Sequence, residues 1–193
     1  GSRLIVDEKV RDALFEKIAA HARSFTPGDP LDATTRMGSM VTEEQMDRVL
    51  GYIDAGRAEG ATTLIGGSRV RVETGGFYIE PTIFDRVRND MTIAREEIFG
   101  PVLSAITVKG FDEAMEVAND TIYGLAGAVW TGSVKNAHRA AKAIKAGVVW
   151  VNCFDRGSMA VPFGGFKQSG FGRDKSLHAM DKYTDLKAMW FAH

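Results

Sequence analysis

The chain has 193 residues, of which 45% are apolar and 25% are charged, so it is long enough to bury a hydrophobic core and predicts one domain with at most an appendage. Its formal net charge is −1, and because Lys and Arg are interspersed with Asp and Glu, we expect no nucleic acid and no membrane surface as partner. The single cysteine cannot form an internal disulfide, which favours a reducing, cytoplasmic location, and no apolar run reaches the roughly eighteen residues that span a bilayer.

Two helices are predicted at the start of the chain. Apolar residues at helical spacing indicate a helix from about Glu8 to Phe25, which the Pro- and Gly-containing segment 27–30 ends. Thr42 and Gln45 have the spacing of a capping box, and the apolar pattern after them predicts a second helix to about Glu59.

Strands and helices then alternate. The strands are predicted where β-branched and aromatic residues gather: Thr62–Ile65, Tyr78–Phe84 with a break at Pro81, Val102–Val108, Leu125–Thr131 and Val148–Asn152. Two helices should lie among them, one capped by Asp112 and running through Asn119, the other capped by Ser133 and running through Lys145; segment 66–77 is predicted to be a hairpin or loop. Val148–Asn152 is uniformly apolar, as are strands buried on both faces. This alternation predicts an α/β fold with a doubly wound, mainly parallel sheet.

The C-terminal part is predicted to differ from this core. Cys153–Phe171 is glycine-rich and indicates a long irregular loop, which is the usual place for functional residues. A helix from Arg173 to Lys182 should follow. Apolar and polar residues alternate over Tyr183–Phe191, which predicts a strand at a sheet edge.

Cys153 stands at the end of an apolar strand, beside the glycine-rich loop. One hypothesis makes it a catalytic nucleophile. The other makes it a buried structural residue, because free cysteine is among the most buried residue types. A reactive thiolate needs positive or hydrogen-bonding surroundings that the sequence does not show, so the structural interpretation is favoured.

Other catalytic motifs are absent or incomplete. Glu96 and Glu97 are adjacent, so their side chains diverge and cannot share a proton. The histidines lack the spacing and the acidic or cysteine neighbours of a metal site. Gly170 and Gly172 begin a dinucleotide fingerprint, but Lys175 occupies the third glycine position, and neither a P-loop nor a serine nucleophile elbow occurs.

Four segments, EEIFGPV (96–102), NDTIYGLAGAVWT (119–131), AGVVWVN (146–152) and PFGGFKQSGFGRD (162–174), stand in this order along the chain. Together they resemble motifs of the NAD(P)-dependent aldehyde dehydrogenase superfamily, and the stretch from residue 156 to 190 further resembles the γ-glutamyl-γ-aminobutyraldehyde dehydrogenases. The resemblance covers essentially the whole chain. It implies most of a catalytic domain over residues 1–171 and a C-terminal helix and oligomerisation arm over residues 172–193.

In that superfamily a thiolate adds to the aldehyde, hydride passes to the nicotinamide, and a carboxylate-activated water hydrolyses the thioester. The nucleophile normally stands in a Cys-x-Ala-Gly-Ser-Arg type of segment, and this chain opens with Gly1, Ser2 and Arg3. The resemblance therefore implies that the nucleophile, the general base and the pyrophosphate-binding helix lie upstream. We expect no catalytic residue in this chain, and no activity from the chain alone.

The resemblance also assigns binding residues. Glu97 would hold the nicotinamide ribose hydroxyls of NAD or NADP, Phe99 would pack beside the nicotinamide, and Gln45 and Arg48 would make further ribose contacts, with Arg48 standing where lysine is common. The alternatives are a solvated loop acid, a core aromatic residue and an exposed helix face.

On the substrate side, Phe163 would line the aldehyde tunnel together with Asp155, Arg156 and Ser158 of the variable loop. A cation at Arg156 could pair with a substrate carboxylate such as that of a γ-glutamyl group, and the alternative is an arginine in water. The implied assembly is a homo-oligomer, a dimer or tetramer formed through the C-terminal strand. The competing function is a non-catalytic scaffold or oligomerisation module, which would not need Glu97, Phe99 and Phe163.

Overall fold

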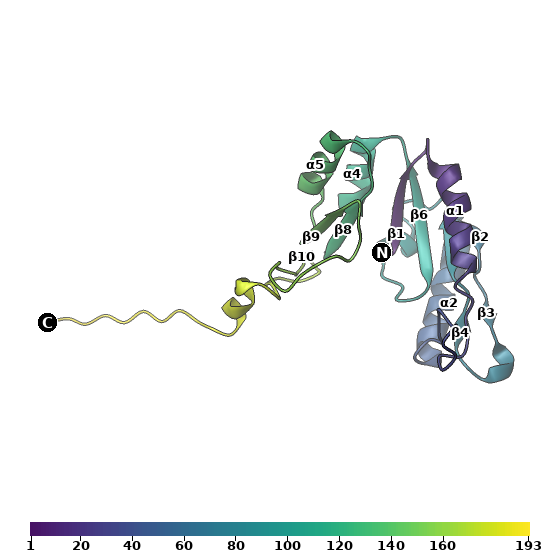
Figure 1. Cartoon of the computed structure of the whole chain (residues 1–193), viewed down its shortest axis with the longest axis horizontal. Helices are drawn as coiled ribbons and strands as arrows, with labels where there is room; N and C mark the ends of the chain where they lie inside the picture. The colour runs from purple at the N-terminus through teal and green to yellow at the C-terminus, as the bar shows by residue number, and fades with distance from the viewer. The chain divides into compact units, whose positions relative to one another are not determined.

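The computed structural model describes all residues, 1–193, in two compact units, Gly1–Val117 and Ala118–His193, each of which is described by itself. Figure 1 labels the elements of both units. The predicted domain boundary between residues 171 and 172 stays a prediction. None of the helices has the length and apolar character needed to cross a bilayer.

A four-stranded sheet forms the centre of the first unit, in the order β1-β6-β5-β2. The strands are β1 (Arg3–Asp7), β2 (Thr62–Ile65), β5 (Thr82–Asp85) and β6 (Val102–Val108). β1 and β5 run parallel to β6, and only the edge strand β2 is antiparallel to its neighbour β5. The prediction of an α/β fold with a mainly parallel sheet is confirmed.

Helices cover both faces of this sheet. The helices are α1 (Arg11–Arg23), α2 (Glu43–Ala58), α3 (Thr92–Arg95) and α4 (Phe111–Asn119). Because side chains alternate along a strand, Ala105 of β6 packs with Phe15 of α1, whereas its neighbour Ile106 joins the larger core of α2 on the other face. Ile53 and Phe84, neither of which is exposed, lie in that larger core.

Several predicted elements in this unit match and others shift. The Thr42 cap of α2 is confirmed, since its side chain accepts a hydrogen bond from Gln45 N, and β2 and β6 have the predicted bounds. Segment 66–77, predicted to be a hairpin or loop, forms most of a hairpin in which β3 (Arg69–Val70) pairs with β4 (Tyr78–Ile79) around the short 3-10 helix η1 (Val72–Thr74). α4 begins at Phe111, one residue before the predicted cap Asp112.

The start of the chain differs from the prediction. Residues 3–7 form β1, which was not predicted, and a turn in which Val10 N donates to Asp7 O precedes the helix. The helix therefore begins at Arg11 and not at Glu8. β1 exists because it pairs over its whole length with Ser104–Val108 of β6, a contact that local sequence does not reveal.

The second unit contains a parallel pair, β8 (Ala126–Val129) and β9 (Val148–Val151), joined through α5 (Val134–Ala143). The predicted Ser133 cap of α5 is confirmed. The expectation that β9 is buried on both faces is wrong, since all four of its residues are only partly buried; within this unit β8 is its one strand partner. The loop after it is also not wholly irregular, because β10 (Phe166–Lys167) pairs with β7 (Tyr123–Gly124).

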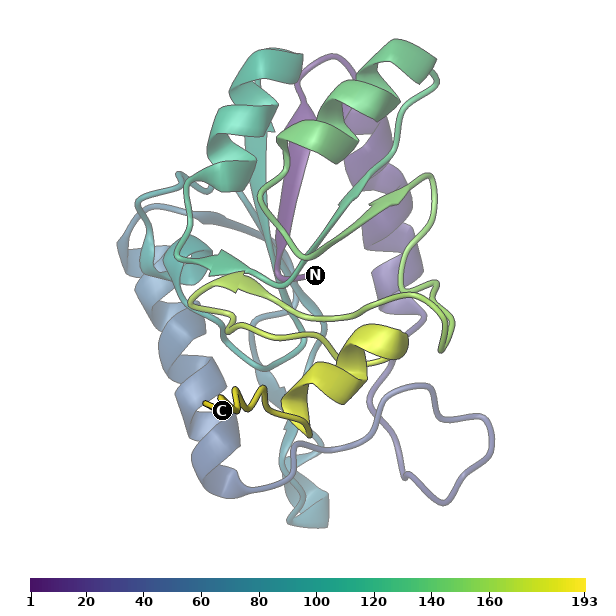
Figure 2. The ribbon, with the colours of Figure 1, turned by 90° about the vertical axis from the view of Figure 1, so that its left-hand side faces the viewer.

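The end of the chain departs most from the prediction. The helix predicted over Arg173–Lys182 is a 3-10 helix, η2 (Leu177–Lys182), seen in yellow in Figure 2. It starts later than predicted because Lys175 and Ser176 have φ values of 57° and 54°, which are not helical. The predicted strand over Tyr183–Phe191 does not form in this chain. A strand needs a hydrogen-bonded neighbour, and no segment of the chain pairs with these residues.

Candidate functional site

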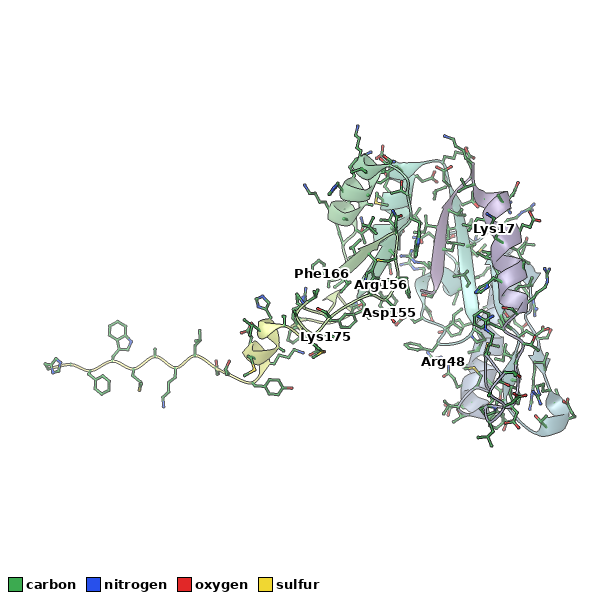
Figure 3. The ribbon with its side chains drawn as sticks, in the orientation of Figure 1. Lys17, Arg48, Asp155, Arg156, Phe166 and Lys175 are labelled. Atoms are coloured by element: carbon green, nitrogen blue, oxygen red, sulfur yellow. The ribbon has the colours of Figure 1, made fainter.

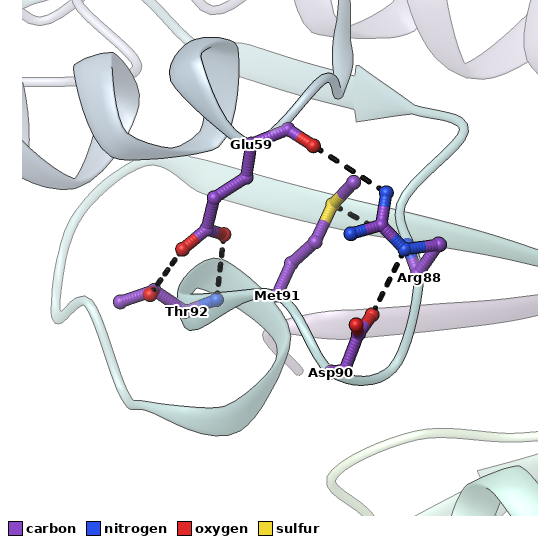
Figure 4. Close-up of polar contacts among 5 residues, drawn as sticks. All are labelled: Glu59, Arg88, Asp90, Met91 and Thr92. Carbon is purple, nitrogen blue, oxygen red and sulfur yellow. Dashed lines mark hydrogen bonds and ion pairs between the residues drawn. The ribbon is translucent and has the colours of Figure 1, made fainter.

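The predicted cofactor residues gather around the segment Glu96–Gly100, which follows α3. A polar cluster fixes the start of α3: Thr92 N and Thr92 Oγ1 donate to the Glu59 carboxylate at 2.8 Å and 2.5 Å (Figure 4). Arg88 donates to the Glu59 carbonyl and to Asp90, so the end of α2 and the turn before α3 are joined. A carboxylate that accepts from the first turn of a helix satisfies donors that have no partner within the helix.

Gln45 shapes the loop itself. Its Nε2 donates to the carbonyls of Ile98 at 3.3 Å and Phe99 at 3.0 Å. Ile98 is buried in the core, whereas Phe99 has a φ of 53° and is 75% exposed. A phenylalanine in the left-handed region is strained, and such strain persists only where surrounding contacts hold it. The loop therefore presents an aromatic ring outward.

The two adjacent acids have different surroundings, as predicted. Glu96 accepts a hydrogen bond from the Tyr52 hydroxyl at 2.6 Å. Glu97 lines a hollow of about 250 Å³ together with Phe99 and the start of the chain, Gly1 and Ser2. Only Glu97 is thus left available to a ligand in this hollow.

Arg48 lies on α2, with its guanidinium carbon 5.9 Å from the ring centre of Tyr52. Interaction with the Tyr52 hydroxyl, and to a lesser extent with the Glu96 and Glu44 carboxylates, raises the pKa of Arg48 above its ordinary value. Arg48 is thus associated with Tyr52 and Glu96, while Gln45 is the residue in contact with the Phe99 loop. Tyr52 has no motif of its own in the sequence, although its position one helical turn after Arg48 is a usable signal.

A second hollow, of about 400 Å³, lies on another side of the same loop. Its lining comes from residues 37–40, Ile79, Phe99, Gly100 and Pro101. Phe99 and Gly100 line both hollows, so this part of the loop is common to them.

The predicted substrate residues lie in the second unit, on the loop after β9. Trp150 Nε1 donates to the Arg156 carbonyl at 2.6 Å, which fixes the loop against the strand, and Asp155 has a φ of 53°. Ser158 Oγ accepts from Ala160 N at 3.2 Å. The side chains of Asp155 and Arg156 are exposed, and Figure 3 labels both.

Phe163 is held by paired backbone hydrogen bonds. Its N donates to Asp174 O at 2.8 Å, and Asp174 N donates back at 2.6 Å. A close approach lies next to it, since a Cβ on Gly147 would stand 1.7 Å from the Gly164 carbonyl oxygen. Only glycine at residue 147 allows this approach, which joins the AGVVWVN and PFGGF motifs.

Two further observations bear on the predictions. Cys153 is a free, half-buried thiol, which does not decide between the two hypotheses for it. No group of three or more His, Cys, Asp and Glu side chains is placed to hold a metal ion. The structure thus brings Glu97, Phe99 and Gln45 together in the first unit, and Asp155, Arg156, Ser158 and Phe163 on one loop system in the second.

A mainly parallel α/β sheet with most of its candidate ligand contacts on the loops after its strands and helices is the architecture of ligand-binding α/β domains. Within that class, the chain belongs to the aldehyde dehydrogenase family, whose model matches residues 1–189.

Individual relatives agree with this family. The chain is 46% identical over 191 residues to an aminoacetaldehyde dehydrogenase of Pseudomonas aeruginosa, covering 98% of this chain and 38% of that protein. It is similar to the crystal structure of γ-glutamyl-γ-aminobutyraldehyde dehydrogenase from Burkholderia cenocepacia (57% identity, TM-score 0.93, 97% of this chain and 38% of that one). It is also similar to an indole-3-acetaldehyde dehydrogenase of P. syringae in complex with NAD+ (54% identity, TM-score 0.95, 99% and 39%). The chain thus spans less than two fifths of the length of these relatives.

Proposed function

We propose that this chain is part of an aldehyde dehydrogenase that oxidises an aldehyde to the carboxylic acid with NAD+ or NADP+, and that the nucleophile and general base lie outside residues 1–193. The observation that carries the proposal is the loop Glu96–Gly100, whose backbone Gln45 holds at Phe99, so that an exposed Phe99 ring stands beside Glu97. The relatives named above, one of them solved with NAD+, support it.

The residues of this loop fit a nicotinamide nucleotide. A carboxylate only accepts hydrogen bonds, and its two oxygens match the two hydroxyls of a ribose, which suits Glu97. An exposed aromatic ring at Phe99 offers a flat apolar surface against which a nicotinamide ring can lie. The chemistry that the cofactor supplies when bound is acceptance of a hydride. Gln45 would act by holding the loop, and Arg48 would contribute a positive charge on α2 beside it.

For the substrate, we propose an amino- or γ-glutamylamino-aldehyde. Phe163 would form an apolar wall, while Asp155, Arg156 and Ser158 would offer polar and charged contacts to the end of the substrate away from the aldehyde. Support comes from relatives named for aminoacetaldehyde and γ-glutamyl-γ-aminobutyraldehyde.

The remaining expectations are proposals as well. Residues 1–171 would belong to the catalytic domain and residues 172–193 to an arm through which copies of the protein associate as a dimer or tetramer in the cytoplasm. Leu186, Trp190 and Phe191 are almost fully exposed in the single chain, and a partner strand would cover such residues.

The test uses the whole protein that carries this chain. Aldehyde-dependent reduction of NAD+ or NADP+ is expected from it and not from residues 1–193 alone. Glu97→Gln should raise the KM for the cofactor about 10-fold or more, because a charge-assisted hydrogen bond is lost. The matched control is Glu96→Gln, whose amide oxygen still accepts from Tyr52 and which should change this KM little.

A non-catalytic scaffold is the competing function. It predicts a whole protein that assembles normally, reduces no cofactor with any aldehyde, and is indifferent to Glu97→Gln. Turnover by residues 1–193 alone that ends when Cys153 is alkylated would contradict both proposals, because it would make Cys153 the nucleophile.

A further inference from the structure

We propose that Lys175 is a specificity-determining residue, and that with Arg156 it binds a carboxylate at the end of the substrate remote from the aldehyde. The inference rests on the proposed function, since it names the substrate class of the same loop. Neither the sequence motifs nor the resemblance to aldehyde dehydrogenases assigned a role to Lys175.

Lys175 is held against the substrate loop from both sides along the backbone. The residue before it, Asp174, exchanges two backbone hydrogen bonds with Phe163, and the residue after it, Ser176, donates its N–H to Met159 O at 2.7 Å. Lys175 and Ser176 both have positive φ values, which ordinary side chains rarely adopt. The backbone is thus kept in a strained conformation that directs Lys175 back towards the loop.

The ammonium group lies over the predicted substrate wall. Lys175 Nζ is 5.4 Å from the ring centre of Phe163, within the range of a cation–π contact. A Cβ built on Gly157 would lie 3.9 Å from the same nitrogen, so this ammonium reaches the residue next to Arg156. Figure 3 shows Lys175 and Arg156 on neighbouring segments.

The other cations of this region already have partners. Lys182 forms an ion pair with Asp174, Lys167 donates to the carbonyls of Asn119 and Thr121, and the Arg173 guanidinium donates to backbone carbonyls.

The side chains of Lys175 and Arg156, in contrast, make no ion pair or hydrogen bond within the chain. Because Lys182 engages Asp174, that carboxylate does not neutralise its neighbour Lys175. Lys175 Nζ thus lies near Gly157, the residue after Arg156, and neither cation has an ion-pair partner within the chain. A substrate carboxylate would supply one.

The nature of the two cations favours a carboxylate over a neutral end group. An ammonium and a guanidinium are both hydrogen-bond donors only. A neutral amide can accept from them through one oxygen, whereas a carboxylate can accept through two charged oxygens. The partial burial of Lys175 against Phe163 also reduces screening by water. Aldehydes that end in a carboxylate, including those with an amino-acid end, form the expected substrate class.

Binding of two small probes to the whole protein that carries this chain tests this without turnover. Glutarate carries the carboxylate, and glutaramide has the same length and no charge. By calorimetry, glutarate should bind about 10-fold or more tightly than glutaramide, and the preference should shrink as salt is added. Lys175→Met, which keeps the stem over Phe163, should remove most of the preference, whereas Lys175→Arg should keep it.

Controls separate a lost charge from a lost fold. Lys142→Met, on α5, should leave the preference unchanged, and Lys175→Gln is a second neutral variant if Lys175→Met unfolds. Equal binding of the two probes, or an unchanged preference in the neutral Lys175 variants, would overturn the proposal. Failure of the whole protein to oxidise any aldehyde, with or without a carboxylate end, would instead count against the proposed function and leave the glutarate result standing.

Discussion

Replacing Arg11 with methionine should destabilise the first unit strongly, because it leaves a buried carboxylate without its cation. Asp85 ends β5, and its side chain is only 4% exposed. Arg11, in the first turn of α1, forms an ion pair with one carboxylate oxygen, while the other oxygen, Oδ1, is buried without a hydrogen-bond partner. This contact with Asp85 is the main cause that raises the pKa of Arg11 above its ordinary value.

The expected loss is about 3 kcal/mol, at the lower end of the range for breaking a buried ion pair, because the Arg11 side chain is 27% exposed and water reaches it. Methionine keeps an apolar stem beside Phe15, over which the guanidinium lies at 4.6 Å. The double variant Arg11→Met/Asp85→Leu should lie within about 1 kcal/mol of the unchanged chain, since no buried charge is then left over.

The assay must report on the first unit. All three tryptophans, Trp130, Trp150 and Trp190, lie in the second unit, so tryptophan fluorescence is unsuitable. Urea unfolding should be followed by hydrogen exchange of peptides from β6 and α1. If Arg11→Met lowers the free energy of unfolding by less than about 0.5 kcal/mol, or if the double variant is as unstable as Arg11→Met, the pair is not desolvated and the reasoning fails.

Three further predictions concern the site and its supports. Glu59→Ala removes the acceptor for the first turn of α3 and should cost about 1–3 kcal/mol in urea unfolding, and an unchanged midpoint would contradict the role of this carboxylate. Gly147→Ala places a Cβ against a backbone carbonyl and should cost more than about 1 kcal/mol, whereas Gly51→Ala, in α2 with open space around it, should gain about 0.5–1 kcal/mol; similar melting shifts for both would refute this. Gln45→Ala should free the Phe99 loop and raise the cofactor dissociation constant of the whole protein about 10-fold, measured by NADH fluorescence, and unaltered binding would show that the loop holds its own shape.

Helix starts that depend on neighbouring residues could be predicted from the sequence. Thr42 and Ser133 both accept a hydrogen bond from the backbone three residues later, a geometry that their spacing alone indicates. β1 could not be predicted in this way, since its partner β6 lies about a hundred residues further on. The C-terminal helix was predicted too long for a related reason: hydrogen bonds from the Phe163 region keep residues 174–176 non-helical.

In the candidate site, too, local features could be predicted from the sequence and contacts between distant residues could not. The divergence of adjacent side chains predicts that at most one of Glu96 and Glu97 borders a site. That this residue is Glu97 depends on Tyr52, which binds Glu96 from a distant helix. The contact of Gln45 with Phe99 joins residues 54 positions apart, and no spacing rule predicts it. In the sequence, Lys175 is notable only because it stands where a dinucleotide fingerprint would need its third glycine. Its proposed role depends on strained backbone angles, which the sequence does not reveal.

The dependence of the Phe99 loop on Gln45 has a consequence for protein engineering. The conformation of the loop is maintained by an amide on a distant helix, so the segment 96–100 is not a portable module. Transplanting it into another scaffold without a glutamine at the matching turn of α2 should let Phe99 relax out of its left-handed conformation. Conversely, in a library of variants that change the loop sequence but keep Gln45, the backbone conformation of the loop should be retained in many variants.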